Sequence, residues 1–374
     1  MQETTDSPHD YNQATAADAS QSPVSPASVE GLVVALAPDA FEVAVPGETV
    51  YCVARGRLRR QRPSPPGAAT RAQGRPPSVA RQGRKEPPAR ALASAADTPE
   101  RPTSIAPGDR VTVTLLGGGR GVIEDIAPRR NALSRARSEL ETEHVMMANV
   151  DLAALVFAVQ EPEPRLGLLD RYLALCEGAG IPPLIIFNKL DLGVSPEIEQ
   201  AMALYAGLGY PVERTSATSG HGIAELRAWL VGRTSLLTGP SGVGKSSLMN
   251  VMLPDANQRT GEISAATGKG RHTTTGARLL PLPEGGWLAD TAGIRELALW
   301  NASAESLPRC FVELRPFADD CEYEDCAHDE DAEGCALRAA LTEGRIAPSR
   351  WESFTRLLAE AREKERPRWA SASR

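Results

Sequence analysis

The pattern of apolar and polar positions changes character near residue 150. Before that point, residues 31–60 and 107–133 form short runs of alternating apolar and polar residues, separated by Pro, Gly and Asp. This alternation is typical of antiparallel strands joined by tight turns. Beyond it, continuous apolar runs alternate with helical patterns, as buried parallel strands and their crossover helices do. We therefore expect a small antiparallel barrel followed by a doubly wound α/β domain.

The same pattern gives the expected boundaries. Residues 349–365 carry apolar side chains at helical spacing, at Trp351, Phe354, Leu357 and Leu358, and predict a closing helix. The strands of the α/β domain are expected at residues 151–159, 182–188, 210–217, 234–239 and 285–290. The expected domains are a tail (1–30), the barrel (31–135), the α/β domain (145–298) and a C-terminal domain (299–374).

Two segments lack the apolar residues that a packed core requires. Residues 1–30 are acidic and rich in Ser and Ala, and residues 61–105 are rich in Pro, Arg, Ala, Ser and Gln. Burial in such segments does not offset the entropy lost on ordering, so we predict a disordered tail and a disordered insertion in a barrel loop. The insertion is basic, because eleven Lys and Arg and one acid, Glu86, lie between Arg55 and Arg90.

Composition limits the compartment and the partners. The 374 residues carry a formal net charge of −7, which argues against a molecule whose whole surface binds nucleic acid but allows local basic patches. No apolar run approaches the ~20 residues of a membrane helix, and the N-terminal residues have no signal-peptide character. We therefore expect a cytoplasmic protein that does not bind membranes. Cys52, Cys176 and Cys310 are interpreted as buried thiols.

The stretch "LLTGPSGVGKSSLMN", residues 236–250, contains the phosphate-loop pattern between an apolar strand and a helix. This is the context that the pattern requires. Its small residues let backbone N–H groups surround phosphates, Lys245 is expected to reach the β- and γ-phosphates, and Ser246 is expected to hold Mg²⁺. The predicted nucleotide-binding residues of this loop are Gly239, Pro240, Ser241, Gly242, Val243, Gly244, Lys245, Ser246 and Ser247.

A guanine-reading motif follows a different strand. The sequence "NKLD" places Asn188, Lys189 and Asp191 at the carboxyl end of a parallel strand, where α/β folds bind ligands. The Asp191 carboxylate would accept hydrogen bonds from the ring N–H and the exocyclic amine of guanine. Adenine lacks this pair of donors, so the motif selects GTP over ATP. Ser216 and Ala217, after the next strand, are expected to offer a backbone N–H to the guanine oxygen.

A third set of residues predicts the switch that senses the γ-phosphate. In "DTAG", residues 290–293, Asp290 would orient Mg²⁺ through water and the Gly293 N–H would contact the γ-phosphate. The preceding "GRHTTT" is a candidate switch loop in which Thr275 is predicted to hold Mg²⁺. The position after the glycine, where many GTPases have a water-orienting glutamine, is isoleucine, and the nearest polar candidate is His272. The predicted catalytic residues are Lys245, His272, Asp290 and Gly293.

The order of these motifs is unusual. In an ordinary GTPase the guanine-reading motif follows the phosphate loop, whereas here it precedes it by about 50 residues. The motifs are those of a GTPase rejoined in another chain order. The fold tolerates this change because strand neighbours, rather than chain order, build the site.

A metal site is predicted in the C-terminal domain. Cys321, Cys326, His328 and Cys335 follow the spacing Cys-x4-Cys-x-His-x6-Cys. Three thiolates and one imidazole complete a tetrahedral set for one structural Zn²⁺ per chain and leave no open position for catalysis. The alternative is a set of free cysteines in an acidic loop.

With these motifs the chain resembles the circularly permuted GTPases of the RsgA (YjeQ) family over roughly residues 31–365, apart from the insertion. The matching stretches, in order, are "VARGRLRR", "PGDRV", "PRRNALSR", "FNKLDL", "GPSGVGKSSLMN", "GRHTTT" and the Cys/His cluster. The resemblance implies an OB-like barrel, a permuted GTPase core and a zinc domain. It also implies GTP hydrolysis stimulated by the small ribosomal subunit during late maturation, with that subunit and its rRNA as partners, and it points to the same His272.

Two departures from the family and two alternative functions accompany this hypothesis. Ala292 stands where the family usually has proline, and six residues separate His328 from Cys335 where the family usually has five. Neither departure removes a ligand.

The alternatives are a zinc-stabilised RNA-binding scaffold that binds GTP without useful turnover, and a permuted GTPase of large-subunit assembly. We expect a monomer.

Overall fold

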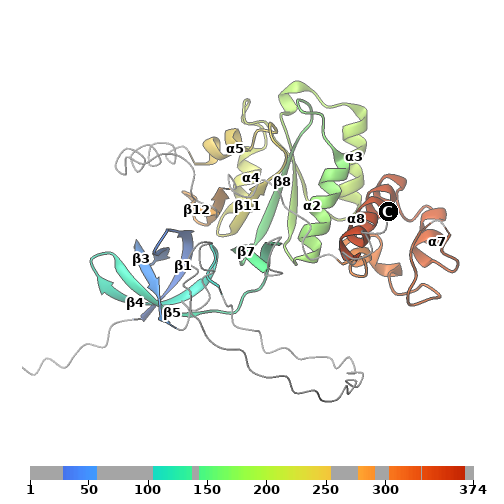
Figure 1. Cartoon of the computed structure of the whole chain (residues 1–374). Coiled ribbons are helices and arrows are strands. Elements are labelled where there is room, and N and C mark those ends of the chain that lie inside the picture. Colours follow the sequence, from blue (N-terminus) through green and yellow to red (C-terminus); the bar gives the residue numbers. More distant parts are fainter. Residues whose placement is uncertain are drawn as a thin grey trace, which may run out of the picture.

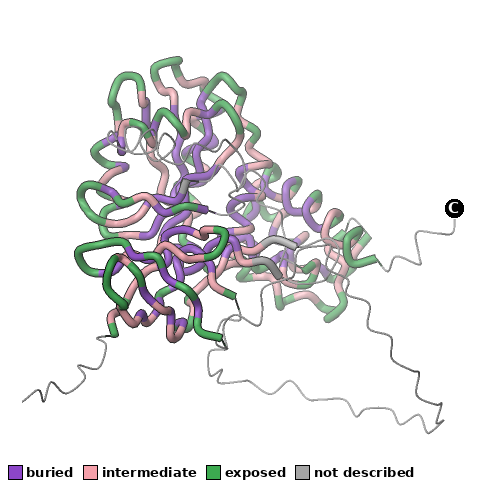
Figure 2. Tube along the Cα trace, turned by 60° about the vertical axis from the view of Figure 1, so that its left-hand side comes forward, coloured by how far each residue is buried: buried purple, intermediate pink, exposed green. Residues whose placement is uncertain are grey.

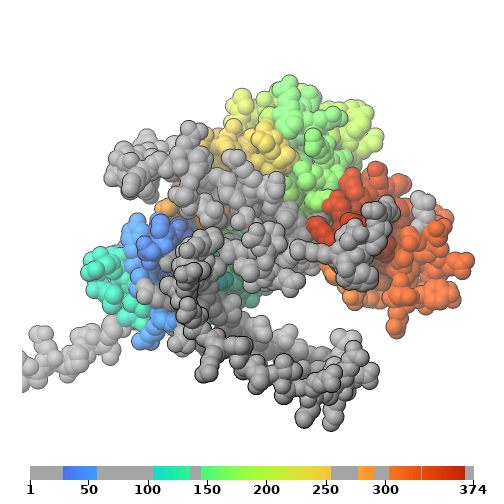
Figure 3. Space-filling view, viewed as in Figure 1, coloured from blue at the N-terminus to red at the C-terminus, as the bar shows by residue number. Residues whose placement is uncertain are grey.

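Three modules follow one another along the chain (Figure 1). The computed structural model describes residues 28–56, 104–136, 143–253, 277–290, 303–329 and 331–366. A five-stranded barrel comes first, a six-stranded α/β module second and a small helical module last. In the space-filling view the barrel (blue and teal) and the helical module (orange and red) lie on either side of the α/β module (Figure 3).

The first module is a closed barrel with the strand order β1-β2-β3-β5-β4. Val43, Val50 and Ile123 belong to its buried core and are preceded and followed along their strands by less buried residues. Strands β3 and β5 pair in parallel, so the barrel is not wholly antiparallel as the alternation predicted, but five strands in this order form the expected OB-like barrel. The strands are β1 (Ser28–Leu36), β2 (Phe41–Val45), β3 (Glu48–Ala54), β4 (Arg110–Gly117) and β5 (Arg120–Ile126).

The edges of the barrel differ from the predicted ones. Ser28 already pairs with Thr114, so the first strand begins inside the segment predicted as a tail. Ile105 packs against the barrel core, so the end of the predicted insertion belongs to the fold. Composition averages over many residues, whereas a single ladder pair or apolar contact decides each of these boundaries. At the other end, β6 (Ala132–Ala136) and β7 (Glu143–Ala148) form a two-stranded sheet of their own.

The second module is one sheet with the strand order β10-β9-β8-β11-β13-β12. The first five of these strands are parallel, as predicted, and β12 is an antiparallel edge strand that the sequence analysis missed, because its four residues are too few to show a period. The strands are β8 (Leu152–Ala158), β9 (Pro183–Asn188), β10 (Val212–Arg214), β11 (Thr234–Thr238), β12 (Arg278–Pro281) and β13 (Trp287–Asp290). The helices are α2 (Leu166–Gly178), η1 (Leu190–Leu192), α3 (Pro196–Gly207), α4 (Ile223–Leu230) and α5 (Lys245–Met252).

Helices cover both faces of this sheet, with α2 and α3 on one side and α4 and α5 on the other (Figure 1). Buried segments run through the middle of the molecule, and exposed segments lie around them (Figure 2). Leu155 and Phe157 of β8 belong to the core that α2 and α3 form, whereas Ala154 and Val156 belong to the core of α4 and α5. All seven residues of β8 are buried. A strand that is covered on both faces requires apolar residues at every position, which explains the continuous apolar run in the sequence.

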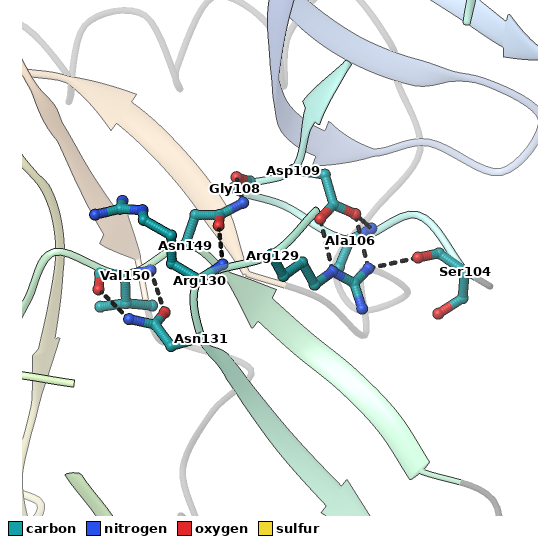
Figure 4. A network of polar contacts seen from close by, with 9 residues as sticks. All are labelled: Ser104, Ala106, Gly108, Asp109, Arg129, Arg130, Asn131, Asn149 and Val150. Atoms are coloured by element: carbon teal, nitrogen blue, oxygen red, sulfur yellow. Dashed lines mark hydrogen bonds and ion pairs between the residues drawn. The ribbon is translucent and has the colours of Figure 1, made fainter. Parts of the chain in front are cut away.

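A polar network joins the barrel to the α/β module (Figure 4). Asp109 is fully buried and accepts from Arg129 through both oxygens, Nε to Oδ1 at 2.7 Å and Nη2 to Oδ2 at 2.8 Å. Arg129 Nη2 also donates to the carbonyl of Ser104, and the backbone N–H of Ala106 donates to Asp109 Oδ2. Removing one partner of a buried ion pair typically costs about 3–5 kcal/mol, so this pair strongly fixes the chain before β4 to the chain after β5, where the junction begins.

Two asparagines complete the junction (Figure 4). Asn149 Nδ2 donates to the carbonyl of Gly108 at 2.9 Å, and its Oδ1 accepts from the backbone N–H of Arg130 at 2.9 Å. Asn131 exchanges two hydrogen bonds with the backbone of Val150, at 2.8 and 2.9 Å. The stretches "PGDRV" and "PRRNAL" therefore fix how the barrel meets the sheet.

The third module, which we call the C-terminal module (residues 303–329 and 331–366), packs on α2. Phe354, Leu357 and Leu358 of α8 are buried in its core and Trp351 is half-buried, which confirms the predicted apolar stripe. Among the described residues, every helix is too short or too polar to span a bilayer. The elements are η2 (Leu307–Cys310), η3 (Arg315–Phe317), α7 (Ala336–Thr342) and α8 (Pro348–Glu365).

Candidate nucleotide site and metal cluster

The predicted motifs meet at one edge of the sheet. Strand β9 ends at Asn188, β11 ends at Thr238 and β13 ends at Asp290. Because these strands are parallel, their carboxyl ends share one edge, where α/β sheets bind ligands. The guanine motif and the phosphate loop are separated in the chain, but β8 alone lies between their strands.

The phosphate loop needs glycine at defined points. Gly239, Gly242 and Gly244 have φ angles of +147°, +82° and +93°, which favour glycine. A Cβ on Gly239 would lie 2.0 Å from the carbonyl oxygen of Val156, and one on Gly244 would lie 2.4 Å from Asn188 Nδ2. The glycines thus let the loop pass close to β8 and to the guanine motif.

Lys245 lies against its own loop. Its Nζ donates to the carbonyls of Gly239 at 2.8 Å and Pro240 at 2.6 Å, which holds the ammonium beside the loop. Ser246 and Ser247 are exposed in the first turn of α5. A lysine ammonium and an exposed serine hydroxyl at the start of a helix are the groups that a phosphate loop uses for phosphates and Mg²⁺.

Asn188 connects three loops. Its buried amide donates through Nδ2 to the carbonyl of Val243 at 2.9 Å, and its Oδ1 accepts from the hydroxyl of Thr215 at 3.0 Å. Val243 belongs to the phosphate loop, and Thr215 directly precedes Ser216. One side chain therefore fixes the spacing between the guanine motif, the phosphate loop and the loop after β10.

The Asp191 carboxylate has a fixed direction. The Ser216 hydroxyl donates to Asp191 Oδ1 at 2.5 Å and accepts from the backbone N–H of Ser219 at 3.1 Å. Ala217 is half-buried and packs against the core beneath α4 and α5. The structure therefore brings together Asn188, Asp191 and Ser216, as the sequence predicts for a guanine site.

The segment after β8 is a part of this site that sequence reasoning missed. Gln160 Nε2 donates to the carbonyls of Leu192 at 3.1 Å and Gly193 at 3.0 Å, and the carbonyl of Glu161 accepts from Lys189 Nζ. The signal was present, because this polar segment also follows the carboxyl end of a buried strand.

The same segment lies beside the phosphate loop. Pro162 and Arg165 line a cavity of about 220 Å³ whose other lining residues include Pro240 and Ser241. Before the chain enters α2, residues 160 and 161 therefore bond to the guanine loop, and Pro162 and Arg165 lie across a cavity from the phosphate loop.

Several predicted residues are not placed. Asp290 is the last residue of β13, where its backbone pairs with Arg278 of β12. His272, Thr275 and Gly293 lie outside the described residues.

The predicted metal ligands converge. The ligand atoms of Cys321, Cys326, His328 and Cys335 all lie within 4.8 Å of one another. The Sγ atoms of Cys321 and Cys335 lie 3.7 and 3.5 Å from His328 Nδ1. Sulfur and nitrogen ligands at ~2.3 and ~2.0 Å from a tetrahedral Zn²⁺ lie about 3.5–3.8 Å apart, so the two distances from His328 match this geometry.

A glycine directly precedes the last ligand of the cluster. Gly334 has a φ angle of +64°, and its carbonyl accepts from the backbone N–H of Glu322 at 3.0 Å. A Cβ on Gly334 would lie 2.5 Å from Glu322 Oε2. Only glycine lets the chain turn this tightly before it reaches Cys335.

Burial and neighbouring groups favour the neutral forms of two residues of the cluster. Burial lowers the pKa of the His328 imidazole and the charge of Arg362 lowers it further, which favours the neutral ligand form. Burial raises the pKa of the Cys335 thiol to about 12, and the Cys321 and Cys326 sulfurs add to the rise. Three thiolates at this distance repel one another unless a dication neutralises them.

Comparisons with known proteins decide the family. A protein of Gemmatimonas aurantiaca named small ribosomal subunit biogenesis GTPase RsgA is 44% identical over 260 residues, covering 68% of this chain and 84% of that protein. A protein of the same name from Moorella thermoacetica is 44% identical over 264 residues, covering 71% and 87%. The RsgA GTPase family profile matches residues 126–300.

The chain belongs to the RsgA GTPase family.

Solved structures agree with this assignment. The crystal structure of YjeQ from Thermotoga maritima is similar to this chain with a TM-score of 0.65 and 30% identity, covering 91% of this chain and all of that one. The structure of YloQ, described as a circularly permuted GTPase, has a TM-score of 0.63 at 23% identity and supports the fold alone. The predicted permuted GTPase fold of this RsgA-family protein is therefore confirmed.

Membership of the RsgA family also bears on the cofactors and the remaining cysteines. A GTPase of this family uses Mg²⁺ with GTP, and the Cys/His cluster is a candidate site for a second metal. Cys52, Cys176 and Cys310 are buried and unpaired, as predicted. Burial raises the pKa of the Cys176 thiol to about 12, so this thiol is unreactive at neutral pH.

Proposed function

We propose that this protein hydrolyses GTP in the late maturation of the small ribosomal subunit, and that the subunit stimulates hydrolysis. The observation that carries the proposal is the joining of the guanine motif to the phosphate loop through the buried Asn188 amide. The names of the relatives that match most of this chain support the ribosomal partner. In this proposal the subunit's rRNA is part of the binding surface.

The residues of the site have the following roles in this proposal. The Asp191 carboxylate, held by the Ser216 hydroxyl, accepts from the guanine ring N–H and the exocyclic amine. The loop from Gly239 to Ser247 surrounds the phosphates with backbone N–H groups. Lys245 leaves its two loop carbonyls and binds the β- and γ-phosphates.

The metals have separate roles. Ser246, Thr275 and Asp290 are the proposed residues around Mg²⁺, which neutralises charge on the phosphates. Cys321, Cys326, His328 and Cys335 are the proposed ligands of one Zn²⁺, which stabilises the C-terminal module and takes no part in hydrolysis.

The proposed setting is the cytoplasm, with the protein acting as a monomer. Assembly of the large subunit is not favoured, because the relatives carry the name of the small subunit. A scaffold without turnover is not favoured either, since the family is one of GTPases.

The test is GTP turnover by the purified protein with and without purified small or large ribosomal subunits. We expect slow turnover alone and a clear rise with small subunits only. Lys245→Ala is expected to lower the stimulated rate by on the order of a hundredfold or more, because it removes a charge that stabilises the transferring phosphoryl group. Equal stimulation by both subunits, or none, would contradict the proposal.

A second prediction concerns His272, which we propose positions the attacking water because the usual glutamine position is Ile294. His272→Ala is expected to bind GTP and small subunits normally and to lose about a hundredfold of the stimulated rate. His221, an exposed histidine after β10, provides the matched control, and His221→Ala should turn over normally. If His272→Ala keeps the full stimulated rate, another group must position the attacking water.

A further inference from the structure

A buried charged network joins the C-terminal module to the α/β module. The Arg350 guanidinium of α8 is 1% exposed and donates to Asp170 Oδ1 of α2 at 2.6 Å. It also donates to Glu313 within its own module, at 2.5 and 3.1 Å. The Tyr205 hydroxyl of α3 donates to the same Asp170 oxygen at 2.7 Å. One arginine therefore holds two buried carboxylates, one on each side of the interface.

Further contacts follow the whole length of α2. At its start, Arg356 of α8 passes so close to Gly167 that a Cβ there would lie 2.0 Å from the guanidinium. In the middle, Arg171 donates to both Glu360 oxygens at 2.5 and 2.6 Å. At its end, Arg315 pairs with the carboxylate of Glu177. The C-terminal module is thus attached mainly to this one helix.

The N-terminal end of the same helix also leads to the nucleotide loops. Of the residues immediately before α2, Gln160 and Glu161 bond to the guanine loop through the amide and the carbonyl, and Pro162 lines a cavity together with the phosphate loop. Leu168, in the first turn of α2, lines the same cavity as Ser241 of the phosphate loop. Asp170, which holds Arg350, is the fifth residue of α2, so a shift at the start of the helix reaches it over little more than one helical turn.

We propose that the segment Gln160–Arg165 and the N-terminal half of helix α2 couple the nucleotide site to the C-terminal module, with Gln160 as the positioning residue on the nucleotide side and Arg350 as the positioning residue on the module side. The coupling rests on the nucleotide site of the proposed function. By linkage, the factor by which the attached module raises GTP affinity equals the factor by which GTP stabilises the attachment.

The test is a double-mutant cycle between Gln160 and Arg350. Gln160→Ala removes the amide that holds the guanine loop, and Arg350→Lys keeps the charge but loses the fork that binds two carboxylates at once. Each single variant is expected to weaken binding of a fluorescent GTP analogue by about fivefold or more. The loss of GTP affinity in the double variant should be clearly smaller than the product of the two single losses, because either change alone already interrupts the coupling.

A reciprocal measurement checks the other direction. GTP is expected to slow hydrogen exchange at the α2–α8 contact in the wild-type protein, and this slowing should be lost in Gln160→Ala. Arg366→Lys is the matched control, since Arg366 is exposed and pairs only with Glu363 at the end of α8 among the described residues, and it should bind GTP as the wild type does.

Two outcomes would overturn the coupling. The first is GTP affinity within twofold of wild type in Arg350→Lys and also in Tyr205→Phe, a milder variant that removes only the hydroxyl donor to Asp170. The second is fully multiplicative effects in the cycle. In either case, loss of GTP binding in Lys245→Ala would show that GTP binds at the proposed nucleotide site. If the wild-type protein binds no GTP, the proposed function is refuted instead.

Discussion

Asp191→Asn is expected to weaken GTP binding by about a hundredfold or more. The carboxylate would accept two hydrogen bonds from guanine, and hydrogen bonds to a charged group are each worth ~1.5–3 kcal/mol. The asparagine amide offers a donor where guanine also has a donor, so one good contact becomes a repulsive one. Xanthine has an oxygen at that position, and the variant should therefore gain affinity for xanthosine nucleotides. Competition binding with GTP, ATP and xanthosine triphosphate measures both changes.

Ser216→Ala is the companion variant for this prediction. It removes the hydroxyl that directs the Asp191 carboxylate but leaves the carboxylate in place, so a smaller loss of about tenfold is expected. If Asp191→Asn binds GTP with unchanged affinity, this loop does not bind the guanine base.

The second large effect is expected at the metal cluster. Wild-type protein should contain one zinc per chain by elemental analysis, and Cys326→Ala should lose it, because one of four ligands is gone. Structural Zn²⁺ contributes ~10–16 kcal/mol of apparent binding free energy that is coupled to folding. The C-terminal module should therefore unfold in the variant, which circular dichroism and proteolysis would detect. The sheet should stay folded, with GTP affinity reduced only by the coupling factor.

Cys310→Ala is the matched control for the metal prediction. Cys310 is buried in the same module, where its thiol faces the carbonyl of Ser306 outside the cluster. This variant should lose some stability from the smaller side chain and keep its zinc. Protein without stoichiometric metal that still resists chelators would contradict the zinc assignment.

The fold was predictable where one periodic signal spans a whole element. The continuously apolar run of β8 and the stripe of α8 each show one period over several residues, and the structure has both elements. The two-stranded sheet of β6 and β7 was not predictable. Its pairing depends on which segments lie opposite each other, as Leu133 and Met147 do, and no local period reports that.

The candidate site was predictable because neighbouring strands, and not the order of the motifs along the chain, bring its residues together. Parallel strands bring their carboxyl ends to one edge, so motifs placed after β9 and β11 must lie near each other. The place of Gln160 and Glu161 near the site could have been predicted from their position after β8. Their bonding partners could not, because one residue acts through a side-chain amide and the other through a backbone carbonyl, and neither belongs to a residue pattern.

Arg350 shows the limit of sequence reasoning most clearly. An arginine in a predicted amphipathic helix is normally expected to face solvent. Arg350, however, is among the most buried side chains of the described residues. Its burial is stable only because it meets Glu313 and Asp170, 37 and 180 residues away in the sequence. Such partners become visible only when the modules are in place.

The strand order of the sheet also has a consequence during synthesis on the ribosome. Strands β8, β9 and β10 are made first and can pair with one another, but the other edge of β8 is covered only by β11, about 80 residues later. At about 5–20 residues per second, an apolar strand edge stays open for roughly 4–16 s. Open edges of this kind promote pairing with other chains. The permuted order thus makes the nascent chain vulnerable to aggregation at a stage when the phosphate loop does not yet exist and GTP cannot protect it.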